Sequence, residues 1–145
     1  MKILHLLATA LLLASPSFAQ VVDGDTIKLA GMTYPLWGID APEGKQACAN
    51  GWPAGLEAYQ ALAALLNNKT VVCEAKTRDR YGRTVALCRA DGMDVQAAMV
   101  RSGMAWAFTQ YSADYVREEA EAKSERLGIH AHACQPAWEW RAERK

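Results

Sequence analysis

The chain has 145 residues, with 16 Lys and Arg against 16 Asp and Glu and a formal net charge of zero. This length suits one domain with one modest core. The balanced charge excludes a protein that holds nucleic acid through its overall charge, because such binding depends on Lys and Arg that neutralise phosphates. Contact with a polynucleotide would require a local basic patch, for which the candidates are Lys76, Arg78, Arg80 and Arg83.

The first 19 residues have the pattern of an export signal. Lys2 supplies a positive charge, residues 3–14 are almost wholly apolar, and Ser17-Phe18-Ala19 fits the rule of small residues at a cleavage site. The alternative is a membrane anchor, but the apolar run is shorter than the roughly 20 residues that span a bilayer. We therefore predict a signal peptide over 1–19 and an exported domain over 20–145. Its location would be periplasmic or secreted, without stable membrane association.

The first half of the domain is predicted to contain strands followed by one helix. Residues 21–29 and 33–39 are rich in β-branched side chains and are interrupted by Gly-containing turns, which favours a strand meander. Residues 53–66 carry apolar side chains at spacings of three and four, which predicts a helix.

A hairpin and two helices are predicted to follow. The hairpin strands lie over 70–75 and 84–89, around a charged turn. Helices are expected over 93–101 and over 112–127, the second with Ser112 as its N-cap. Strands first, one helix between them and helices last is the order of an α+β domain with antiparallel pairing.

Four cysteines lie after the predicted signal, and an exported chain meets an oxidising compartment, so we predict two disulfides. Three pairings are possible. Cys73 and Cys88 are equally distant from the middle of the hairpin turn, so antiparallel strands would place them face to face. This favours a Cys73–Cys88 bridge and leaves Cys48 for Cys134. A zinc site is the alternative, but the chain has no CxxC pair.

Three acidic side chains form a candidate metal site. Asp23 and Asp25 in VVDGDTI are two apart on an extended segment, so both tend to point to the same side, and Asp40 ends a strand that could lie alongside. Grouped carboxylates suit a hard cation such as calcium or magnesium. The alternative is that Asp-Gly only marks a turn.

Two further residues have side chains suited to phosphodiester hydrolysis. Glu43 follows Pro42 in DAPE, where the fixed proline dihedral aims the loop, and a carboxylate next to a reactive water is a sound general base. Arg83 in DRYGR offers a rigid fork of donors that matches two phosphoryl oxygens. The alternatives are a surface glutamate and an arginine that only pairs with Asp79 across the turn.

Taken together, VVDGDTI, YPLWGIDAPE and DRYGR resemble the staphylococcal nuclease-like (thermonuclease) family, and the likeness runs from about Val21 to the PAWEWR segment near the C-terminus. The resemblance implies a five-stranded OB-fold β-barrel with three α-helices. It also implies a calcium-dependent nuclease that hydrolyses phosphodiester bonds of DNA and/or RNA at the P–O5′ bond.

The resemblance also implies roles for single residues. Glu43 matches the family's presumed base and Arg83 its second catalytic arginine. The implied calcium ligands are Asp25, Asp40 and the backbone carbonyl of Ala41, with Asp23 as a neighbour just outside this set. The implied substrate contacts are Arg80, Tyr81 and Tyr111. We expect a monomer that acts on nucleic acid, with single strands favoured.

One position departs from the family pattern. Pro35 stands five residues before Asp40, where the family usually has its first catalytic arginine. Proline has neither a charge nor a donor. The enzyme could run slowly on Arg83 and metal alone, or the site could only bind. A further alternative is that another base reaches the space, for which the candidates are Lys28, Lys45 and Arg78. The competing function is therefore a non-catalytic OB-fold protein that binds nucleotides or single strands.

Overall fold

The computed structural model describes residues 18–145. The signal peptide predicted over residues 1–19 lies outside the described residues, except for its last two. The described part combines short sheets with helices in an α+β arrangement, as the order of predicted elements indicated. No helix in this part is both long enough and apolar enough to cross a bilayer.

The first sheet is a three-stranded antiparallel meander of β1 (Gln20–Asp23), β2 (Thr26–Leu29) and β3 (Met32–Pro35). Pro35 is the last residue of β3, which is an outer strand of this sheet. A proline is tolerated there because its missing N–H removes no bond from the centre of a sheet.

A close glycine contact positions the turn between β1 and β2. A Cβ atom added at Gly24 would lie 2.6 Å from the Cβ of Ala58 and 2.9 Å from the Cβ of Ala41. Glycine therefore lets this turn pack directly against a helix and against the loop that follows Asp40. The turn carries Asp23 and Asp25, so the contact brings the two acidic segments together.

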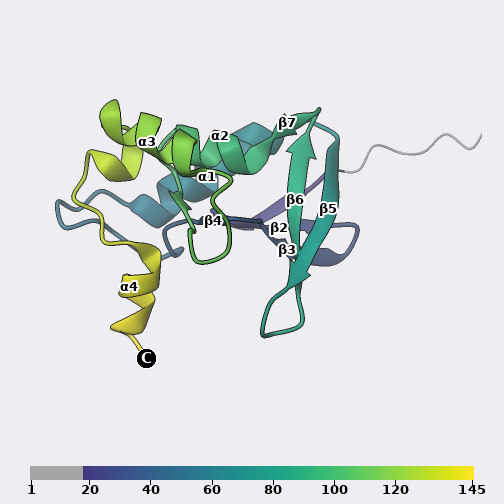
Figure 1. Ribbon diagram of the computed structural model, residues 1–145, viewed down its shortest axis with the longest axis horizontal. Coiled ribbons are helices and arrows are strands. Elements are labelled where there is room, and N and C mark those ends of the chain that lie inside the picture. Colours follow the sequence, from purple (N-terminus) through teal and green to yellow (C-terminus); the bar gives the residue numbers. More distant parts are fainter. Residues whose placement is uncertain (1–17) are drawn as a thin grey trace, which may run out of the picture.

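The second sheet is built on a long hairpin of β5 (Val71–Arg78) and β6 (Thr84–Ala90), with β7 (Met93–Asp94) paired to β6. The hairpin tip projects from the lower side of the body in Figure 1, the side on which the C-terminal helix also lies. Cys73 and Cys88 face each other across the hairpin and form a disulfide, which is the pair favoured from the sequence.

Two short links join the β structure. β4 (Ile39–Asp40) pairs with β8 (Trp106–Ala107), and Leu36 forms a parallel bridge with Ala86 of β6. The described residues thus contain eight strand segments in three sheets. The α+β class is confirmed, whereas the five-stranded closed barrel remains a prediction.

The described residues contain four α-helices, one more than expected. Their bounds are α1 (Ala54–Leu66), α2 (Val95–Arg101), α3 (Val116–Ser124) and α4 (Ala137–Ala142). The additional helix is α4, close to the C-terminus, and a 3₁₀ turn at Gly128–His130 precedes it.

α3 is shorter at both ends than the helix predicted over residues 112–127. Ser112 is not its N-cap, because the Ser112 hydroxyl accepts the backbone N–H of Asp114 at 3.0 Å in a turn before the helix. Arg126 has a φ of 53°, in the left-handed region, so the helix ends before that residue.

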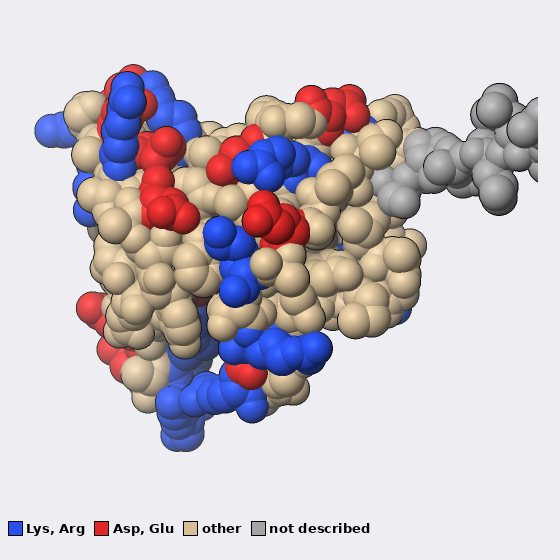
Figure 2. All heavy atoms as spheres, turned by 45° about the vertical axis from the view of Figure 1, so that its right-hand side comes forward, with Lys and Arg blue, Asp and Glu red and all other residues tan. Residues whose placement is uncertain are grey.

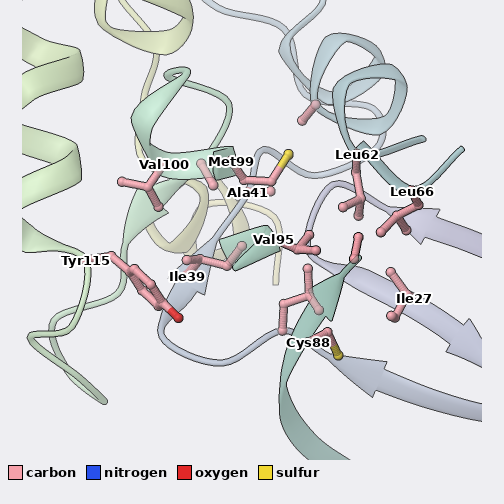
Figure 3. Packing of buried hydrophobic residues seen from close by; sticks show 14 of the residues in the cluster. Ile27, Ile39, Ala41, Leu62, Leu66, Cys88, Val95, Met99, Val100 and Tyr115 are labelled. Atoms are coloured by element: carbon pink, nitrogen blue, oxygen red, sulfur yellow. The ribbon is translucent and has the colours of Figure 1, made fainter. Parts of the chain in front are cut away.

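One apolar core joins the first helices to the sheets. Ile27 of β2, Leu62 of α1, and Val95 and Met99 of α2 have no exposed surface. Figure 3 shows their side chains converging in the interior. A smaller cluster attaches the C-terminal segment to the body, and its buried members are Trp106, Ile129 and Ala137.

Candidate active site

Most residues singled out by sequence line one cavity of about 600 Å³. Its walls come from the meander, the tip of the β5–β6 hairpin and α4. The predicted site residues that line it are Asp23, Asp25, Asp40, Glu43, Arg80, Tyr81, Arg83 and Tyr111. Ala41 is buried and does not line the cavity. Pro35 and Arg78 line it as well, whereas Lys28 and Lys45 do not.

Asp25 is the centre of the acidic group. Its Oδ2 accepts the backbone N–H of Ala41 at 2.8 Å, and its Oδ1 accepts the Thr26 hydroxyl at 3.1 Å. Burial raises the pKa of Asp25 well above its ordinary value, and the negative charges of Asp23 and Asp40 raise it further. The fold therefore holds carboxylates where their charges oppose one another.

A cation would relieve this repulsion. Within residues 18–145 no group of three or more His, Cys, Asp or Glu side chains is arranged as a ready metal centre. The donors present nevertheless fit an oxygen-preferring cation, because Asp25 and Asp40 both line the cavity and the negative charge of Asp40 raises the pKa of Asp25. Backbone carbonyls can add to such carboxylate ligands, and Ala41 follows Asp40 directly and donates its N–H to Asp25.

The backbone of Glu43 is fixed from two sides. A Cβ atom at Gly55, in the first turn of α1, would lie 2.0 Å from the Glu43 carbonyl oxygen, so only glycine allows this approach. The Glu43 N–H donates to the Gln46 side-chain oxygen at 3.1 Å. The buried Gln46 amide also donates to the Gln135 carbonyl at 2.6 Å. One buried side chain thus connects the Glu43 loop to the C-terminal segment.

A disulfide makes the same connection covalently. Cys48, shortly after Glu43, is bonded to Cys134, shortly before α4. This is the second pair favoured from the sequence. Together with Gln46, it holds the segment that leads into α4 against the loop that carries Glu43.

The hairpin tip positions Arg83. Asp79 accepts the backbone N–H groups of Tyr81 and Arg83, each at 2.9 Å, and the Arg83 Nε at 2.7 Å. Burial opposes the effect, but these hydrogen bonds lower the pKa of Asp79. The Arg83 guanidinium makes no other hydrogen bond within the described residues, so its two terminal nitrogens are available to a ligand. The pairing with Asp79 therefore does not exclude contact with a phosphate.

A fourth arginine, which the sequence analysis did not identify, enters the cavity from α4. Arg141 donates from Nη1 to Asp40 Oδ1 at 3.0 Å and from Nη2 to Asp40 Oδ2 at 2.8 Å. Nη1 also donates to Glu43 Oε1. The hydrogen bond with Asp40 raises the pKa of Arg141, burial opposes this, and Glu43 adds to the increase. Arg141 therefore joins the candidate metal ligand to the candidate base.

The sequence contains a weak signal for α4 but none for its contacts. Pro136 precedes the six residues of α4, and a proline at a helix start is a recognised pattern. The contacts of Arg141 join residues 101 and 98 positions apart, and no local pattern indicates such a distance.

Aromatic and basic side chains surround the opening. Tyr81 and Tyr111 are 71% and 63% exposed. The Phe108 ring lies 5.0 Å from the Tyr111 ring and is stacked at 5.7 Å on Trp138. Figure 2 shows a group of Lys and Arg side chains at the lower end of the face that it presents, where the hairpin projects in Figure 1, besides others at the upper left and in the middle. Exposed rings beside basic groups suit a single-stranded polynucleotide.

Comparison with known proteins gives a consistent result. The family model described as staphylococcal nuclease homologue matches residues 33–132. Protein ParB of Escherichia coli is 35% identical over 159 residues, covering 92% of this chain and 86% of that protein. The micrococcal nuclease of Shigella flexneri is 32% identical over 163 residues, covering 95% and 90%.

An uncharacterized endonuclease of Escherichia coli O157:H7 is 37% identical over 130 residues, which cover 84% of this chain and 81% of that protein. These matches confirm the resemblance drawn from the three motifs. The chain belongs to the staphylococcal nuclease homologue family.

Proposed function

We propose that this chain is an exported, calcium-dependent nuclease that hydrolyses phosphodiester bonds of DNA and/or RNA, with single strands favoured. The domain of residues 20–145 would act after removal of residues 1–19. One observation carries the proposal: the candidate base, the candidate carboxylate ligands and the candidate phosphate-binding arginine line the same cavity. These groups are Glu43, Asp25 with Asp40, and Arg83.

The proposed metal requirement is supported by the donors and by the family, whose nucleases generally use calcium. Asp25, Asp40 and the Ala41 carbonyl would hold the ion, and water or substrate oxygens would complete its coordination. When bound, calcium supplies positive charge that stabilises the negative phosphoryl oxygens in the transition state.

The remaining chemistry belongs to the side chains. Glu43 accepts a proton from the water that attacks phosphorus, while the bond from phosphorus to the leaving oxygen breaks. Arg83 donates to two phosphoryl oxygens on which negative charge increases during the attack. Loss of one such donor costs about 3 kcal/mol in comparable sites. Arg80 would contact a neighbouring phosphate.

The preference for single strands rests on the exposed rings. Tyr81 and Tyr111 can reach unstacked bases, and stacking on an aromatic ring contributes roughly 1–3 kcal/mol per base. Bases within a duplex are already stacked on one another, so they offer no free face to these rings.

The test is cleavage of fluorescent single-stranded DNA and RNA by the oxidised protein, first with calcium and then with a chelator. We expect chelator-sensitive cleavage that Glu43→Gln lowers by a factor of about 10² or more. Glu139→Gln, an exposed glutamate on α4 without a side-chain hydrogen bond among the described residues, is the matched control and should retain the native rate.

Pro35 is the observation that favours a second function. Proline offers no donor to a phosphate, so the site could bind without turnover. If the native protein fails to cleave with calcium, magnesium or manganese and yet binds the oligonucleotide, the nuclease proposal is wrong. A non-catalytic binding protein of nucleotides or single strands would then be the better conclusion.

A further inference from the structure

We propose that Arg141 is a second phosphate-binding arginine of this site, which contacts the scissile phosphate together with Arg83. The inference rests on the nuclease function proposed above. Both arginines line the same cavity, one from α4 and one from the hairpin tip. Pro35, on another wall of that cavity, has no donor to offer.

The charges around the cavity favour such a group. Five carboxylates line it, namely Asp23, Asp25, Asp40, Glu43 and Asp79, and the last of these is paired with Arg83. An entering phosphodiester is itself an anion, so these carboxylates repel it. Arg83 is already paired with Asp79, and Arg78 donates to the Gly82 carbonyl at 3.0 Å. Arg141 supplies the positive charge next to the acidic group itself.

The hydrogen bonds of Arg141 leave one edge of its guanidinium for a ligand. A guanidinium carries five N–H donors, two on each terminal nitrogen and one on Nε. Asp40 takes one hydrogen from each terminal nitrogen, and Glu43 takes the second hydrogen of Nη1. Nε and the second Nη2 hydrogen have no partner among the described residues. These two donors form the side of the fork that binds two oxygens of one phosphate.

The position of this arginine is well supported. Ala137 at the start of α4 has no exposed surface, and the Cys48–Cys134 disulfide lies just before the helix. The pairing with Asp40 does not prevent that carboxylate from binding a cation, because an ionised carboxylate has about four lone-pair positions and Arg141 uses two. The Arg141 side chain is 38% exposed, so a ligand can reach it.

The experiment measures cleavage with calcium and, separately, equilibrium binding of a fluorescent single-stranded oligonucleotide in chelator at several salt concentrations. The variants are Arg141→Ala, Arg141→Lys and Arg141→Ala combined with Pro35→Arg. The control is Arg144→Ala, since Arg144 lies on the same segment, where it packs over Trp140 and pairs with Glu143.

We expect Arg141→Ala to lower the cleavage rate by roughly 10²–10³-fold. It should also weaken binding and reduce the slope of log affinity against log salt by about 0.7, the value for one phosphate contact on a single strand. Arg141→Lys should keep the salt slope but lose part of the rate, because an ammonium lacks the fork. The double variant with Pro35→Arg should cleave at least tenfold faster than Arg141→Ala alone. Arg144→Ala should cleave and bind as the native protein does.

Two outcomes would overturn the inference. The first is native cleavage and binding by Arg141→Ala. The second is an Arg141→Ala variant that cleaves slowly but keeps the native salt slope and does not recover when Pro35→Arg is added. That result would limit Arg141 to positioning Asp40 and Glu43. If the alanine variant does not fold, Arg141→Lys tests the inference instead. A lysine variant that cleaves at the full native rate would show that the two-donor fork of Arg141 has no role. If the native protein does not cleave, but Arg141→Ala binds the oligonucleotide more weakly and with a smaller salt slope, the nuclease proposal is rejected and the phosphate contact of Arg141 is retained.

Discussion

Two arginines enter the cavity from regions that are held in very different ways. Arg83 is held by Asp79, only four residues away, within the tip of one hairpin. Arg141 is fixed by Asp40, 101 residues away, at the end of a short C-terminal helix. One half of the site is therefore a local structure, and the other half depends on the attachment of the tail.

The attachments of the two regions differ in the same way. The Cys73–Cys88 disulfide closes a 15-residue separation within one hairpin, whereas Cys48–Cys134 closes a separation of 86 residues between the Glu43 loop and the tail. A change in the hairpin should therefore act on Arg83 and its neighbours at the tip, and not on Arg141. A change at the tail should act on Arg141 and on the surroundings of Glu43 together.

The largest expected effect is at the local arginine. Arg83→Ala should lower kcat/KM by roughly 10²–10³-fold, because the donor to the developing phosphoryl charge is lost. Asp79→Asn should cost less, since Arg83 remains but loses its charged partner. Initial rates with excess calcium measure both. If Asp79→Asn is as damaging as Arg83→Ala, the shape of the hairpin rather than the arginine donor is the important feature.

Removal of the disulfides is expected to have the next largest effects, and these should differ between the two regions. On the entropy model, removing Cys73–Cys88 costs about 3 kcal/mol of unfolding free energy and removing Cys48–Cys134 about 4.5 kcal/mol. Well below both melting temperatures, the first double alanine variant should keep its cleavage rate. The second should lose roughly tenfold, because a small displacement of Arg141 and Glu43 reduces the rate.

Urea unfolding and initial rates test this prediction on the same samples. The hairpin variant serves as the control for a general loss of stability. Equal rates in both double variants would show that the tail stays in place without its disulfide, held by Gln46 and the apolar cluster around Ala137.

The elements with local signals were predicted well from the sequence. The helix expected over 53–66 is α1 at Ala54–Leu66, and the strands expected over 70–75 and 84–89 are β5 and β6. Apolar spacing and turn residues determine these elements within a few neighbouring positions. Glu43 and Arg83 could be singled out for the same reason, because each belongs to a short motif.

Features that depend on distant contacts were missed. Arg141 lies after the residues 33–132 that the family model matches, and only the packed tail brings it to Asp40. The chemistry of Arg141 could be read from the sequence, whereas its partners were set by tertiary structure. Ser112 was misassigned for a local reason, because its hydroxyl accepts the N–H of Asp114 in a turn instead of capping α3.

The smallest expected effect distinguishes the tail from the hairpin by pH. His130, in the 3₁₀ turn before α4, has a buried Nε2 without a partner among the described residues, and burial lowers its pKa, with a further contribution from the Lys123 charge. The unfolded chain then binds the proton more readily, so this contribution to stability is complete above about pH 6.5 and is lost as pH falls toward the lowered folded value. The pKa of Asp79 is also lowered, so its contribution to stability persists until pH falls below the ordinary value of 3.8.

Urea unfolding between pH 8 and pH 5 tests this difference. The free energy of unfolding should change less with pH for His130→Asn than for the native protein, because acid weakens the tail first. Parallel profiles would place the first acid-sensitive contact outside the tail.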